Sequence, residues 1–383
     1  MHYSTITRKK SKIKSRTFAI DQEKMIAVAI FLLLFCILTK PTTYSESVIN
    51  GLKLFFSSVL PGLLPFMFLC KVLTNLNIQS HLGFIEKPMQ KLFGLSKECV
   101  YPFMISIISG YPIGSKITAD LYVSQKISDK DLLKCAVLSS TSGLIFIIGS
   151  VGASMLKSAK IGINIYVSSI ISCIISVVLI NIFEKLKQHK TKKALKPSTN
   201  NKEAENIISQ PRFIYGEQKL ENKNNFDINT KNNSLKQNKP NILNIITNSA
   251  NDTCQSLLIV CFYISFFFVL IDILNQTKIL SLFSKAISVL FSSNPEKTAL
   301  SQGVMSGIVE MTRGVKMLSL MKNPLSLSLI CSLISFGGFS IIFQSLAFLS
   351  KTNLKFSKFI FAKILQAVIA FPICYALLLV FKI

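Results

Sequence analysis

Charged side chains lie beside glycine-broken helix at two places in otherwise apolar, membrane-length sequence. The first is residues 109–116, and the second is residues 306–314, where Glu310 and Arg313 are three residues apart. Because lipid offers no hydrogen bonds, irregular backbone and ionised side chains persist at bilayer depth only where protein or a watered cavity satisfies them. The two stretches therefore predict a solute site in a transporter built from two repeats.

The first stretch has the residue types of an anion site. Its candidate binding residues are Ser109, Gly110, Pro112, Gly114 and Lys116. The two glycines and the proline remove helix continuity and so expose backbone amides, which attract an anion together with the positive end of a helix dipole. In the alternative, Lys116 extends to the membrane interface and pairs with Asp120, four residues further on.

The second stretch combines a carboxylate with a guanidinium group. If the stretch is helical, Glu310 and Arg313 share one helix face. Arg313 could then clasp a substrate carboxylate through two hydrogen bonds, and Glu310 could carry a coupling proton or sodium ion. The alternative is a mutual ion pair at the membrane edge, with Lys316 solvated.

Two polar patches stand at similar places in the two halves. Residues 139–143 and 335–340 are rich in serine and glycine, and Gln344 follows a turn later. Their candidate binding residues are Ser142, Gly143, Gly337 and Gly338. They could form walls of a cavity, although small residues also serve close helix packing. Asp252 and Asp272 lie in or near apolar runs, and the sequence assigns them no role.

Composition defines the class of protein. Half of the 383 residues are hydrophobic, 16% are charged and the mean hydropathy is +0.48, which indicates an all-α polytopic membrane protein. The net charge of +25 is concentrated in an amino-terminal tail and a central segment. Both flank apolar runs and have no pattern of stacking aromatics, so the positive-inside rule explains them better than binding to nucleic acid.

Catalytic and metal-binding patterns are missing from the sequence. The nine cysteines include no CxxC pair, the chain has three histidines, and HExxH, GxSxG and P-loop motifs are absent. We therefore expect neither an enzyme nor an ATP-driven pump, and no cofactor beyond a coupling proton or sodium ion.

Apolar runs and a polar interruption divide the chain into four parts. We predict a basic cytoplasmic tail (1–24), an amino-terminal membrane half (25–184), a basic disordered linker (185–241) and a carboxy-terminal membrane half (242–383). Ser109-Gly110 and Ser306-Gly307 are 197 residues apart, and the two polar patches are offset by about as much. This agreement favours an internal duplication, although whether the halves are inverted stays open.

The topology follows if the tail and the linker lie on one face of the membrane. Residues 25–39 have no small-x-small cleavage site after them and are expected to remain as a signal-anchor helix. The first half must then cross the membrane an even number of times. A re-entrant segment around Gly110 leaves four crossings there.

An ordered set of motifs resembles one known family. Residues 51–66, the Ser-Gly-Tyr-Pro-x-Gly-x-Lys motif at 109–116, the glycine pattern at 141–152, Glu-Met-Thr-x-Gly at 310–314 and Ser-Phe-Gly-Gly at 335–338 are similar to the YlbJ, or SpoVV, sporulation integral membrane proteins. That family is grouped with the nucleoside-recognition "gate" superfamily, which includes concentrative nucleoside transporters. The resemblance runs from about Gly51 to Ala370.

The resemblance implies a role in endospore formation. It implies a multi-pass protein of the outer forespore membrane that moves dipicolinic acid toward the developing spore, with Lys116 and Arg313 on the carboxylates. The alternatives are a nucleoside permease and a non-transporting scaffold of the spore envelope. Expected partners are the anionic solute, the lipid bilayer and either further copies of the chain or other sporulation membrane proteins.

Overall fold

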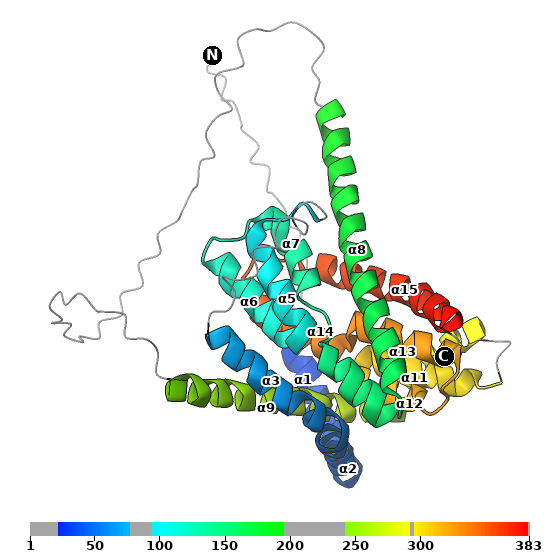
Figure 1. The fold of residues 1–383 in the computed structure, drawn as a ribbon. Coiled ribbons are helices and arrows are strands. Elements are labelled where there is room, and N and C mark those ends of the chain that lie inside the picture. Colours follow the sequence, from blue (N-terminus) through cyan, green and yellow to red (C-terminus); the bar gives the residue numbers. More distant parts are fainter. Residues whose placement is uncertain (1–21, 77–89, 91–92, 195–241, 292–294, 382–383) are drawn as a thin grey trace, which may run out of the picture.

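The structure is a computed structural model that describes residues 22–76, 90, 93–194, 242–291 and 295–381. These residues form helices and their connections, with no strand among them (Figure 1). The expected tail up to residue 21 and residues 195–241 of the expected linker lie outside the described residues.

The helices fall into two sets. The first half contains α1 (Gln22–Thr39), α2 (Pro41–Leu54), α3 (Leu60–Asn75), α5 (Val100–Ser109), α6 (Tyr111–Val123), α7 (Asp129–Leu138) and α8 (Ala159–Ala194). The second half contains α9 (Ile242–Gln276), α10 (Ile279–Ser288), α11 (Lys297–Val309), α12 (Met311–Leu318), α13 (Pro324–Phe336), α14 (Gly338–Leu349) and α15 (Phe356–Val380). Short 3-10 turns occupy Lys97–Cys99 and Val289–Phe291, and wider π-helical turns occupy Phe55–Val59 and Phe146–Met155.

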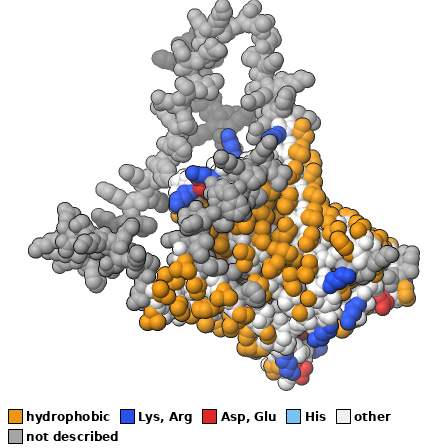
Figure 2. All heavy atoms as spheres, viewed as in Figure 1, with side chains coloured by type: hydrophobic (Ala, Val, Ile, Leu, Met, Phe, Trp, Pro, Cys, Tyr) orange, Lys and Arg blue, Asp and Glu red, His pale blue; other side chains and the backbone are white. Residues whose placement is uncertain are grey.

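Helix length and surface agree with a membrane protein. Five segments of the described chain are long and apolar enough to cross a bilayer: Pro41–Leu69, Ala159–Lys187, Ile242–Gln276, Pro324–Leu349 and Phe356–Val380. Figure 2 shows hydrophobic side chains over much of the described surface in that view, including α8, which projects from the helical body in Figure 1. The expected class, an all-α polytopic membrane protein, is confirmed.

Each half contains one short helical hairpin. A Cβ atom on Gly114 would lie 2.8 Å from the Cβ of Ser106, and one on Gly314 would lie 2.2 Å from the Cα of Gly307. In a continuous helix, residues seven or eight apart would be separated by about 10–12 Å. The chain therefore reverses between α5 and α6 at Gly110, and between α11 and α12 at Glu310. With arms of 8 to 13 residues, neither hairpin spans a hydrocarbon core of roughly 30 Å.

A broken helix follows each hairpin. After α7, residues 139–143 are not helical, and the helix resumes at Leu144. After α13, Gly337 adopts a left-handed conformation with φ of 92°, and α14 begins at Gly338. Both halves thus contain a hairpin and then an interrupted helix.

The structure locates one predicted break more closely and contradicts one predicted boundary. Within the predicted broken stretch 306–314, Ser306 and Gly307 lie inside α11, and the chain reverses at Glu310, whose side chain caps the following helix. The expected start of the linker at residue 185 is wrong, because α8 continues to Ala194. Lysine is a good helix former, so the basic residues that follow Glu184 extend this helix.

The halves share their hydrophobic core. One cluster joins Ile147 and Ile165 of the first half to Val315, Ile330 and other residues of the second. The boundary between the halves is therefore a packed interface of hydrophobic side chains, and polar groups within it must find partners there.

Candidate functional site

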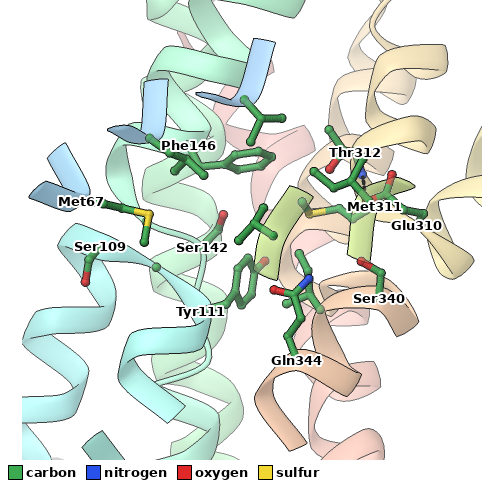
Figure 3. A pocket seen from close by; sticks show the side chains of 17 residues that line it. Met67, Ser109, Tyr111, Ser142, Phe146, Glu310, Met311, Thr312, Ser340 and Gln344 are labelled. Carbon is green, nitrogen blue, oxygen red and sulfur yellow. Dashed lines mark hydrogen bonds between the residues drawn. The ribbon is translucent and has the colours of Figure 1, made fainter. Parts of the chain in front are cut away.

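A cavity lies where the helix breaks of the two halves meet (Figure 3). Its walls are made by Val59, Leu63, Met67, Ser109, Gly110, Tyr111, Ser142, Gly143, Phe146, Val260, Ile264, Glu310, Met311, Thr312, Ser340, Ile341 and Gln344. It has about 50 Å³ of space for the centres of water-sized molecules, whereas one water needs roughly 10–15 Å³ by this measure. The described conformation is therefore closed around space for a few waters.

The wall formed by the first half is a close contact between two backbone segments, at Gly110 and at Gly143. A Cβ atom on Gly110 would lie 2.9 Å from the backbone nitrogen of Gly143, so these positions admit no side chain. Ser109 donates to the carbonyl of Ile105 at 2.7 Å, within its own helix. The buried hydroxyl of Ser142 has no hydrogen-bond partner and lines the cavity. This wall therefore presents the amide end of α6 and an unpaired hydroxyl.

The second wall contains a capped helix end. The Glu310 carboxylate, which is fully buried, accepts hydrogen bonds from the backbone N–H groups of Thr312 at 3.1 Å and Arg313 at 2.6 Å. It is therefore the N-cap of α12 and offsets the positive end of that helix. Ser340, in the first turn of α14, has a buried hydroxyl with no partner, as Ser142 does.

Figure 3 shows how the walls face each other. Tyr111, Ser142 and Phe146 of the first half lie opposite Met311 and Gln344 of the second. The Tyr111 hydroxyl donates to the carbonyl of Ile334 at the end of α13, so this ring bridges the two halves. Apolar side chains and a few polar groups thus surround the space, as is usual for small-molecule sites.

The side chain of Arg313 does not line this cavity and forms no ion pair with Glu310. Its guanidinium donates to Asp272 of α9 at 2.7 Å and to the carbonyl of Phe268 at 3.3 Å. Asp272 also accepts a hydrogen bond from Ser47 of α2 at 2.6 Å. The alternative of a mutual ion pair is therefore wrong, because the Glu310 carboxylate caps α12 through backbone N–H groups while the Arg313 guanidinium reaches Asp272. Arg313 instead joins the hairpin to α9, which gives Asp272 a role.

Other candidate residues serve the frame of the site. Lys116 is exposed on α6 and is absent from the cavity wall. Gly114 allows α6 to approach the carbonyl of Ser139, where a Cβ would lie 2.1 Å from the oxygen. Gly338 allows close contact with Gly307 and Met311, while Gly337 and Pro112 mark the beginnings of α14 and α6. Asp252 forms an ion pair with Lys71 at 3.7 Å.

Lys363, a charged residue near the cavity, was not among the residues predicted from the sequence. Lys363 of α15 is 1% exposed, and its Nζ donates to the carbonyl of Ser140 at 2.7 Å and to Gln366 at 2.9 Å. A lysine within the apolar run 359–381 was the available signal, because ionisable residues in membrane spans are costly and usually functional.

Fold and cavity together define a polytopic helical membrane protein whose broken helices converge on a central site. No protein-family model matches the chain, and no solved structure matches it. The sporulation integral membrane protein YlbJ of Bacillus subtilis (strain 168) is 26% identical over 356 residues, which cover 90% of this chain and 80% of the relative. This similarity supports the YlbJ-type family for the chain, as the motifs indicated.

Proposed function

We propose that this sporulation membrane protein transports a small organic anion, with dipicolinate as the first candidate, through the cavity between the helix breaks. The observation that carries the proposal is the pair of unpartnered hydroxyls, Ser142 and Ser340, on opposite halves of one buried cavity. Leaving a buried hydroxyl without a partner costs about 1–3 kcal/mol. A solute or water in the cavity would supply both partners.

Transport through this cavity requires the two hairpins to move, because a rigid cavity of this size would not admit the solute. The closed cavity is too small for an aromatic dicarboxylate, so the tips at Gly110 and Glu310 must separate for one to enter. Each tip contacts the broken helix of its own half, through Gly143 in the first and Gly338 in the second. Two hairpins that open in turn would give access from the two sides of the membrane.

Glu310 is the candidate for ion coupling. Its carboxylate lies in the cavity wall. A solute with carboxylates would be repelled there unless a proton or a cation neutralised one of the two like charges. Coupling of the solute to a proton or a sodium ion would meet that need. The outer forespore membrane is the proposed location, and it rests on the family resemblance.

A nucleoside permease is the second candidate function. Among the described residues that line the cavity, Glu310 is the single carboxylate, and no lysine or arginine is present. The mainly apolar walls and the amide of Gln344 also suit a neutral heteroaromatic solute. A non-transporting scaffold would use the same breaks for packing alone.

The test is uptake of labelled dipicolinate and a labelled nucleoside into liposomes that contain the purified full chain. The variant Ser142→Ala/Ser340→Ala removes the cavity hydroxyls, and Ser150→Ala/Ser335→Ala removes two buried unpartnered hydroxyls that do not line it. We expect dipicolinate uptake by the wild type, a several-fold loss in the first variant and normal uptake in the second.

Other outcomes reject parts of the proposal. Nucleoside uptake without dipicolinate uptake favours the permease alternative. Absence of both, with folded and inserted protein, favours the scaffold. Equal losses in the two double variants would mean that the cavity hydroxyls have no special part in transport.

A further inference from the structure

Lys363 is a buried cation that lacks a carboxylate partner. Of the two lysines that are buried in the described part of the chain, Lys134 forms ion pairs with Asp131 and Glu184, at 3.9 Å and 3.6 Å. Lys363 forms no ion pair with any described carboxylate, and its hydrogen bonds go to two neutral oxygens. Burying a charge in this way is costly unless an opposite charge comes near.

The ammonium group lies directly behind the first wall of the cavity. Its Nζ is 5.7 Å from the centre of the Tyr111 ring, which lines the cavity. Its acceptor, Ser140, is two residues before Ser142 in the same non-helical segment. One layer of side chain and backbone therefore separates this charge from the space that a solute would occupy.

The two cations first expected to bind the solute are less suited to this role. The charge of Arg313 is paired with Asp272 at 2.7 Å, and Lys116 is exposed, where solvent or lipid headgroups screen its charge. The carboxyl group of Glu310 lies on the opposite wall. Lys363 is thus the positive charge best placed to compensate an anion in the cavity.

We infer that Lys363 is the residue that makes the cavity prefer anionic solutes, an inference that rests on the proposed transport function. In this role the charge of Lys363 attracts the solute electrostatically from behind Tyr111 and Ser140, without contact with the solute in the closed state. An alternative, purely structural lysine would only satisfy the Ser140 carbonyl. The two roles differ in one respect, because only the first changes selectivity between charged and neutral solutes.

The experiment compares uptake of dipicolinate with uptake of its neutral diamide by wild type, K363Q, K363M and K363R at pH 7. At a separation of about 8–10 Å and an effective dielectric constant near 20, one charge is expected to change the preference for a dianion by about a hundredfold or more. K363Q and K363M should lower the dipicolinate-to-diamide ratio by that factor, and K363R should retain most of it. Two neutral variants guard against misfolding of one, and K116Q is the matched control with an unchanged ratio.

Thermal stabilisation by dipicolinate is measured on the same purified proteins. Wild-type uptake with an unchanged ratio in the neutral variants overturns the inference and leaves the proposed transport intact. Stabilisation that is lost in K363Q, without wild-type uptake, supports an anion site at Lys363 and rejects transport. Neither uptake nor stabilisation of the wild type rejects both.

Discussion

The two hairpin tips occupy corresponding places in the two halves but reverse the chain by different means. Gly110 has φ of 88° and ψ of −170°, a conformation open essentially to glycine alone. Glu310 has φ of −134° and ψ of 111°, which is ordinary extended backbone, and its side chain caps the helix that follows. One tip depends on the absence of a side chain and the other on its presence.

This difference makes the electrostatics of the cavity asymmetric. The first tip is bare backbone with the cation Lys363 behind it, and the second carries a buried carboxylate. A site assembled from two similar halves thus has a lysine behind one wall and a carboxyl group in the other. Such walls can bind a solute on one side and its coupling ion on the other.

Gly110→Ala is the variant with the largest expected effect on this comparison. The added Cβ would lie 2.9 Å from the nitrogen of Gly143, and strain at a glycine-only conformation alone costs about 1–3 kcal/mol. We expect little folded protein in the membrane and no uptake. Gly149→Ala is the control, because its Cβ would meet its nearest neighbour at 3.6 Å, an ordinary contact. Normal abundance of Gly110→Ala would refute the close approach of the two breaks.

Two variants of Glu310 distinguish its role as a helix cap from its role as a charged group. Glu310→Ala should lower stability by about 1–2 kcal/mol through loss of the N-cap, whereas Glu310→Gln keeps an acceptor for one N–H and should lose less. Both should lose ion-dependent uptake, since both lack the carboxylate. Thermal unfolding and uptake at several proton and sodium gradients provide the readouts. Unchanged ion dependence in Glu310→Gln would remove Glu310 from coupling.

Arg313 and Asp272 are expected to act together in holding the second hairpin. Arg313→Ala should lower stability by about 1–2 kcal/mol, because the pair is partly exposed and a fully buried one would cost more. In Arg313→Ala/Asp272→Ala, the loss should be smaller than the sum of the two single losses. Additive losses in a thermal-unfolding cycle would show that the pair is uncoupled. Loss of uptake at unchanged stability would instead indicate that Arg313 binds the solute.

Lys116 is expected to show the smallest effect. Lys116→Gln changes an exposed side chain outside the cavity, so stability should change by no more than about 0.5 kcal/mol. Uptake of dipicolinate should equal that of the wild type within error. A large loss of uptake would place the anion near the first hairpin arm, away from the cavity.

The sequence predicted features that depend on nearby residues. Hydropathy marked the apolar spans, and glycine marked the break at Gly110, because both signals are local. The second break was predicted only as the stretch 306–314, since glycines at helix–helix contacts and glycines at chain reversals look alike in sequence. The Arg313–Asp272 pair joins residues 41 apart, which no local pattern reveals. Lys363 was visible as a charge within a span, but its contact with Ser140 depends on how the halves pack.

The most direct test of the account is an experimental structure of the full chain with dipicolinate bound. We predict solute density between the two hairpin tips, within hydrogen-bond distance of Ser142 and Ser340, and with the tips further apart than in the closed state. Density beside Lys116, or in the separate pocket that Arg313 lines with Asn275 and Gln302, would contradict the central claim that solute binds where the broken helices of both halves meet.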